Sequence, residues 1–139
     1  EKDGNKTVLS GVPKSLPSII KAYRIQEKAS NVGFDWDDRN QVWDKVKEEI
    51  SEYQAEIDNM DNAKATEEFG DLMFSLINAA RLYHINPDNA LELTNQKFIR
   101  RFNYIEETAK SQGRMMTDLN LDEMDSLWNE AKRKEKTDS

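Results

Sequence analysis

The stretch EEFGDLMFSLINAARL, residues 67–82, predicts a helix that is apolar around most of its circumference. At about 100° per residue, one side of this helix carries only apolar side chains, namely Phe69, Leu72, Met73, Leu76, Ile77 and Ala80. Glu68 and Asp71 lie one turn apart on the other side, in a narrow polar stripe with Ser75 and Asn78. Such a helix is typical of the interior of a helical bundle, with its polar stripe facing a cleft.

The composition of the chain also indicates helices. Its 139 residues suit a single domain, with 37% hydrophobic and 34% charged residues but only five Gly and three Pro. The net charge of −7 argues against binding to nucleic acid or to an anionic membrane surface. The absence of cysteine excludes disulfides and thiolate chemistry and is compatible with a reducing cytoplasm, where we expect the protein. No signal peptide or membrane span is evident in the sequence.

Apolar periodicity and capping signals predict an all-α bundle of about five helices, with no candidate strand. The expected helices cover residues 15–32, 38–57, 63–83, 87–112 and 120 onward. The turn GFDWDD separates the first two helices, and Asn120 with Glu123 forms a capping-box pattern before the last. We expect a tail or linker at 1–14, a catalytic domain at 15–135 and a frayed tail at 136–139. The apolar seam expected for the fourth helix is Leu91, Phe98, Phe102, Ile105 and Ala109.

The second predicted helix carries a further set of carboxylates, Glu48, Glu49 and Glu52. Glu49 and Glu52 are one turn apart, and if the second and third helices form an antiparallel hairpin, this pair converges with the pair Glu68 and Asp71. Converging carboxylates with no nearby lysine would repel one another, and a hard divalent cation would remove that penalty. Oxygen ligands alone select Mg²⁺ or Mn²⁺. The alternative is that each acidic pair belongs to a solvated helix face; a di-iron centre is a weaker rival, because the only histidine lies at the far end of the third helix.

Cations and an aromatic residue recur at helical spacing further along the chain. Lys97 and Arg101 are four residues apart on the fourth helix, and Trp128 and Lys132 repeat this spacing on the last. Taken alone, they are ordinary surface cations and a tryptophan at the edge of the core. Beside a metal cluster, however, a triphosphate needs such cations, and a nucleobase needs a flat surface on which to stack.

These segments together resemble the MazG family of nucleoside triphosphate pyrophosphohydrolases. The resemblance extends from about residue 11 to about residue 135, and its most specific part is a double acidic motif. The family signature is Glu-Glu-x-x-Glu followed by Glu-x-x-Asp. Every position is occupied in this chain, by Glu48, Glu49, Glu52, Glu68 and Asp71. Further similar segments are GVPKSLPSIIKAYRIQEKASNVGFDW, NQKFIRRF and LWNEAKRKE.

The resemblance implies an α-helical homodimer that binds Mg²⁺ through Glu49, Glu52, Glu68 and Asp71. By position, Lys97, Arg101, Trp128 and Lys132 resemble the nucleotide-contacting residues of the family. The implied reaction converts a nucleoside triphosphate and water into a nucleoside monophosphate and pyrophosphate. The chain is also similar to the second, catalytic half of a two-domain member, so we expect it to be a piece of a longer polypeptide.

The expected mechanism is attack of a metal-activated water on the α-phosphorus, with Glu48 or Glu52 accepting its proton; the sequence does not choose between them. Phe34 and Trp36 either border the base or anchor the helical hairpin. Two alternatives remain open for the function. One is a non-catalytic helical dimer that senses nucleotide or metal or joins partners. The other is an all-α pyrophosphohydrolase devoted to one substrate, of the dUTPase or phosphoribosyl-ATP type.

Overall fold

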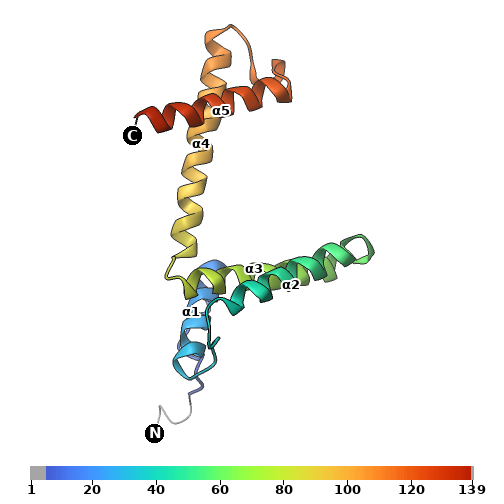
Figure 1. The fold of residues 1–139 in the computed structure, drawn as a ribbon, viewed down its shortest axis with the longest axis vertical. Helices are drawn as coiled ribbons and strands as arrows, with labels where there is room; N and C mark the ends of the chain where they lie inside the picture. Colours follow the sequence, from blue (N-terminus) through green and yellow to red (C-terminus); the bar gives the residue numbers. More distant parts are fainter. Residues whose placement is uncertain (1–5, 139) are drawn as a thin grey trace. The chain divides into compact units, whose positions relative to one another are not determined.

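The computed structural model describes residues 6–138, and within this range the chain contains helices and no strand (Figure 1). The predicted tails at 1–14 and 136–139 therefore lie partly outside the described residues. The five α-helices are α1 Ser18–Asn31, α2 Gln41–Glu56, α3 Asn62–Leu82, α4 Pro87–Ser111 and α5 Leu121–Asp138. Short 3₁₀ helices, η2 Ile57–Asn59 and η3 Met116–Asp118, follow α2 and precede α5. The all-α prediction is confirmed.

The helix boundaries differ from the predicted ones by a few residues. Helix α1 begins at Ser18, three residues later than expected, because Pro17 lies outside the helix with an extended backbone (φ −56°, ψ 147°). Its carbonyl still accepts a hydrogen bond from the amide of Lys21 (2.8 Å), so it serves as the N-cap. Helix α1 ends before Gly33, whose φ of 96° favours glycine. None of the described helices combines the length and apolar character needed to cross a membrane.

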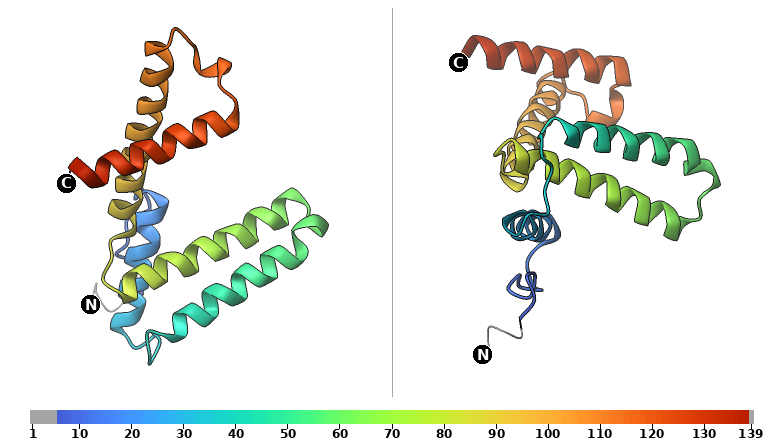
Figure 2. Two further views of the ribbon diagram at one scale, coloured as in Figure 1. Left: turned by 45° about the horizontal axis from the view of Figure 1, so that its top comes forward. Right: turned by 60° about the horizontal axis from the view of Figure 1, so that its bottom comes forward.

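The chain divides into two compact units, residues 1–90 and residues 91–139, and each unit is described by itself. In the first unit, α2 and α3 form an antiparallel hairpin, and α1 packs on α3 (Figures 1 and 2). The turn of the hairpin is closed by Asp61, whose side chain accepts a hydrogen bond from the amide of Lys64 (2.8 Å).

The hairpin is fixed at its open end by a small core. Val42, Val46 and Ala79 are buried there, and Leu82 and Tyr83 pack against them. The Tyr83 hydroxyl accepts a hydrogen bond from Trp43 Nε1 (2.9 Å) and donates one to Asn40 Oδ1 (3.0 Å). These contacts hold the start of α2 against the end of α3, and thereby set which residues of the two helices face each other further along.

In the second unit, the C-terminal part of α4 packs against η3 and α5. Ile105, Ala109 and Leu119 are buried, with Leu127 and Trp128 of α5 against them. The predicted capping box is confirmed: the Asn120 amide donates to Glu123 Oε1 (3.0 Å), and the Glu123 amide donates to Asn120 Oδ1 (2.8 Å).

The predicted apolar seam of α4 is correct only at its C-terminal end. Ile105 and Ala109 are buried, whereas Leu91, Phe98 and Phe102 are 47%, 55% and 39% exposed. The physical reason is that the core of the second unit gathers around Ile105 and Ala109, near the loop that leads to α5. The periodicity therefore identified the apolar face of α4, but it did not show which part of that face is buried by other residues.

Candidate functional site

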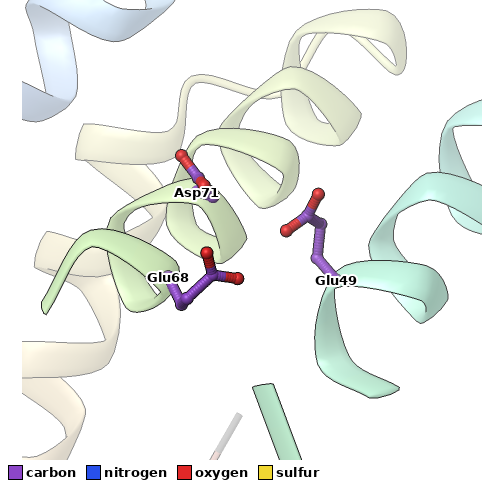
Figure 3. Close-up of side chains that lie close together, drawn as sticks. All are labelled: Glu49, Glu68 and Asp71. Atoms are coloured by element: carbon purple, nitrogen blue, oxygen red, sulfur yellow. The ribbon is translucent and has the colours of Figure 1, made fainter. Parts of the chain in front are cut away.

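Three carboxylates from two helices meet on the inner face of the hairpin. Glu49 extends from α2 toward Glu68 and Asp71 of α3 (Figure 3). One oxygen of each lies within 4.8 Å of the others. Glu49 is buried at 8% exposure, whereas Asp71 is exposed, so the cluster reaches from the helix interface to the surface. These are three of the four ligands predicted from the sequence.

Two lysines accompany the cluster, and the expectation of carboxylates with no nearby lysine was wrong. Lys45 pairs with Glu49 (3.0 Å) and Lys64 pairs with Glu68 (3.6 Å), each from the preceding turn of the same helix. Hydrogen bonding to Glu49 raises the pKa of Lys45. Each lysine precedes its partner by four residues, a spacing that brings side chains together on a helix and that indicates both pairs from the sequence. The two lysine side chains are 42% and 58% exposed, so these ion pairs contribute little stability and a cation can replace them.

Glu52, the fourth predicted ligand, is exposed and lies outside the three-carboxylate cluster. The pKa of the Glu52 carboxyl is raised nevertheless. The largest cause is desolvation, and the next is repulsion from the negative charges of Glu49, Glu48 and Glu68. Glu48 is also exposed. The oxygen-only donor set, the closeness of the three carboxylates and the surplus negative charge fit a hard divalent cation. The cluster is therefore able to hold a metal ion.

A cavity of about 790 Å³ in the first unit opens beside the cluster. Glu49 and Asp71 form part of its wall. The remaining wall is mostly apolar and comes chiefly from α1, from α3 and from the loop after α1, with Leu9 before α1 and Lys45 of α2; it includes Ile25, Gln26, Ala29, Phe34, Trp36 and Phe74. Such a volume, with a mainly apolar lining and a charged end, is typical of a small-molecule site.

The loop after α1 is tied to α3 by an ion pair. Arg81 Nη2 and Nη1 donate to the Asp35 carboxylate (2.7 and 3.3 Å), and Arg81 Nε donates to Asn78 Oδ1 (3.0 Å). Hydrogen bonding to Arg81 holds the pKa of Asp35 below its usual range. Phe34, next in the loop, remains 82% exposed. It therefore lines the cavity without acting as a buried anchor, and Trp36 is also partly exposed there.

Three residues of this cavity were not predicted from the sequence. Asp35 and Arg81 were not expected to pair, because 46 positions separate them and only the fold brings them together. Gln26 had no predicted role, although a polar residue within an otherwise apolar helix face is a usable signal.

The predicted nucleotide-contacting residues belong to the second unit. Arg101 donates to Glu135 (2.8 Å) and lies over the ring of Trp128, 5.4 Å from its centroid. Lys97 and Lys132 are exposed, and within the described part of this unit neither forms an ion pair. The structure thus brings Arg101 and Trp128 together and leaves the two lysines in solvent.

The known proteins to which the chain is similar agree with one another in the family they indicate. Residues 39–105, which include the whole acidic cluster, match the MazG nucleotide pyrophosphohydrolase domain. Over 131 residues the chain is 41% identical to nucleoside triphosphate pyrophosphohydrolase of Escherichia coli K12, covering 93% of this chain and 50% of that protein. It is 38% identical over 122 residues to nucleoside triphosphate pyrophosphohydrolase/pyrophosphatase MazG of Thermotoga maritima, covering 88% and 47%.

A third relative, the uncharacterized protein YabN of Bacillus subtilis, is 50% identical over 133 residues, covering 94% of this chain and 27% of YabN. The chain thus spans half or less of the length of these relatives.

Proposed function

Because the chain belongs to the MazG family of nucleotide pyrophosphohydrolases, we propose that it hydrolyses nucleoside triphosphates to nucleoside monophosphate and pyrophosphate. The observation that carries this proposal is the meeting of Glu49, Glu68 and Asp71 at the wall of a ligand-sized cavity. A cavity with a carboxylate cluster at one end suits a ligand that brings both polyphosphate and divalent cation, since polyphosphate alone would be repelled.

The proposed cofactor is Mg²⁺, with Mn²⁺ as a substitute, held by Glu49, Glu68 and Asp71 and joined by Glu52. When bound, the cation neutralises phosphate charge and lowers the pKa of a coordinated water. Lys45 and Lys64 balance part of the carboxylate charge before the cation arrives. Glu48 or Glu52 accepts the proton of the attacking water; both are exposed beside the cluster.

The phosphates and base of the substrate need further partners, which we assign to the second unit. Lys97, Arg101 and Lys132 bind phosphate oxygens, and Trp128 offers a flat ring. Arg101 already binds an anion, because its Nε and Nη2 both donate to Oε1 of Glu135 (3.1 and 2.8 Å). When substrate binds, a phosphate group therefore takes the place of the Glu135 carboxylate at the Arg101 guanidinium.

We place the catalytic domain at residues 15–135 in a cytoplasmic homodimer, with residues 1–14 and 136–139 as tails; within the second tail, residues 136–138 continue helix α5. The cytoplasmic assignment is supported by the proposed substrates, because cells keep their nucleoside triphosphates in the cytoplasm. The dimer is supported by apolar side chains that are exposed on α3 and α4.

The test is product analysis with a mixture of nucleoside triphosphates, with Mg²⁺ and with excess EDTA. We expect equal amounts of monophosphate and pyrophosphate with Mg²⁺ and none with EDTA. In ¹⁸O-labelled water, label should enter the monophosphate, because attack occurs at the α-phosphorus. Label in pyrophosphate, or release of orthophosphate, would contradict the reaction. Nucleotide binding without turnover would instead support a sensor or interaction module.

A further inference from the structure

The first unit contains a second pocket, of about 380 Å³, at the C-terminal end of α3. Its wall combines one face of α1 with Arg81 of α3 and with His84, just beyond that helix. At about 100° per residue, the α1 residues of this wall lie on the face of the helix opposite to Gln26 and Ala29, which line the larger cavity. The two pockets are therefore distinct, although Arg81 lines both.

The wall of this second pocket is positively charged, in a chain whose net charge is −7. Among the described residues that line it, Arg24, Lys28 and Arg81 are cations, and Glu27 is the only carboxylate. Neither Arg24 nor Lys28 forms an ion pair within residues 6–138. These two cations are four residues apart on one helix, where like charges repel each other. A ligand with several negative charges would remove that repulsion.

His84 occupies its place in the wall at a conformational cost. Its φ of 60° belongs to the left-handed region, where glycine is the least strained residue. The Ile85 amide donates to the Ala80 carbonyl (2.9 Å) and the His84 amide to the Arg81 carbonyl (3.0 Å), a pattern that usually places glycine at the position of His84. Histidine keeps a side chain at the pocket that glycine would lack, and its ring carries an N–H donor in either protonation state.

A ligand that suits this wall is compact, polar and multiply charged, because the lining is more polar than apolar and offers several N–H donors. We propose that the second pocket binds a diphosphate group that carries no divalent cation. Phosphate oxygens accept strong hydrogen bonds from guanidinium, ammonium and imidazole groups. Two kinds of molecule present such a group: inorganic pyrophosphate, which the proposed reaction releases, and a nucleoside diphosphate. This site differs from the acidic cluster, which repels a polyphosphate that brings no cation.

Arg81 links the second pocket to the larger cavity. Its guanidinium donates to the Asp35 carboxylate (2.7 and 3.3 Å), and this ion pair ties the loop that carries Phe34 and Trp36 to α3. A diphosphate in the second pocket competes with Asp35 for the same N–H groups. Binding of the anion and formation of the ion pair therefore oppose each other, and weakening the ion pair should tighten binding of the anion.

The test is calorimetric titration of the whole chain with pyrophosphate, at low ionic strength and in buffer freed of divalent cations by a chelating resin. Without a cation the acidic cluster repels the anion, so binding reports on the second pocket. We expect Kd to rise about tenfold in Arg24→Met and in Lys28→Met, because each variant loses a charge-assisted hydrogen bond. Lys14→Met, at an exposed lysine of the same unit outside the pocket, should bind as the wild type does.

Two variants of the loop after α1 test the role of Arg81. Asp35→Asn should lower the Kd for pyrophosphate, because it frees the guanidinium of Arg81. Asp37→Asn makes the same change at an exposed position of the same loop and should leave the Kd unchanged. The same titration with ADP identifies the source of the group: binding that weakens in Lys28→Met indicates a nucleotide, and binding of pyrophosphate alone indicates the inorganic anion.

Binding of neither anion, binding that requires Mg²⁺, or an equal Kd in the wild type, Arg24→Met and Lys28→Met would overturn the inference. The titration needs neither metal nor turnover, so its result is independent of the proposed function. A chain that hydrolyses no nucleotide but binds pyrophosphate in this way would retain the second site. Turnover without metal-free binding of either anion would leave the reaction standing and refute the site.

Discussion

The three carboxylates of the cluster are not equivalent. Glu49 and Glu68 each have a lysine one turn away, whereas Asp71 has no ion pair among the described residues. Asp71 therefore adds negative charge to a site whose other members are already partly compensated. In the absence of a cation its charge raises the energy of the folded state, and in the presence of one it supplies a ligand.

This asymmetry predicts opposite effects of Asp71→Asn on stability and on activity. In EDTA the variant should melt at the same temperature as the wild type or higher, because one repelling charge is removed. Pyrophosphate release should fall by at least about a hundredfold, as expected for loss of a direct ligand. Mg²⁺ at a hundred times its Kd should stabilise the wild type by about 2.7 kcal/mol and the variant by less.

Glu67→Gln is the matched control for this experiment. Glu67 directly precedes Glu68 but is exposed and lies outside the cluster, so this variant also loses one negative charge without changing the cluster. It should keep both activity and the response to Mg²⁺. If Asp71 served only the scaffold, Asp71→Asn would melt lower in EDTA and still turn over, and the metal assignment would then be wrong.

Arg100 and Arg101 offer a second matched pair, since both donate to Glu135. The side chain of Arg101 is 13% exposed and lies over Trp128, whereas that of Arg100 is 59% exposed. We expect Arg101→Met to lower kcat/KM by about ten- to a hundredfold through lost phosphate contacts, and Arg100→Met to have little effect. Steady-state kinetics of both variants check this, and equal losses would reject the assignment of Arg101.

At the level of elements, local signals were predicted well and tertiary ones were not. The capping box of Asn120 and Glu123 was evident because both partners lie within one helical turn. The spacing of acids on two consecutive helices likewise indicated the cluster, since a short turn forces these helices to be neighbours. By contrast, the exposure of Leu91 and Phe98 depends on what covers α4, which no helical period encodes.

The start of α5 should be sensitive to acid. Bonding to Arg114 and to the Asn120 amide lowers the pKa of Glu123 from 4.5 to about 2. Because the folded-state value is the lower one, this carboxylate stabilises the helix fully above pH 4.5. The contribution declines as the pH falls toward about 2 and is absent below it. Hydrogen exchange of the amides of residues 120–124 should therefore show less protection in that pH range.

Glu123→Gln should reduce the same protection at neutral pH and flatten its dependence on acid. Glu107→Gln, an exposed acid on α4, is the control and should leave the protection of the α5 start unchanged. Equal protection at neutral pH in Glu123→Gln and wild type would show that the Asn120 side chain alone caps the helix.

An assembly of whole chains is suggested by apolar side chains that the first unit leaves exposed. On α3 the exposed stripe consists of Phe69, Met73 and Leu76, which are 48%, 40% and 46% exposed. Their spacing of four and three residues places them within about 60° on the helix, away from the acidic cluster. A surface of this kind is covered in an assembly, and a symmetric pair of identical chains is the commonest way to cover it.

We therefore expect a homodimer whose interface includes the α3 stripe. Met73→Glu places a charge at the centre of the stripe, and burial in a dimer interface would leave that charge without a partner. At micromolar concentration, light scattering should therefore report a dimer for the wild type and a monomer for the variant. Val8→Glu introduces the same charge at an apolar residue of similar exposure, 49%, outside the helices, and should stay dimeric. A monomeric wild type would contradict the dimer itself. A dimeric Met73→Glu would place the interface elsewhere, with the exposed Phe98 and Phe102 of α4 as the next surface to alter.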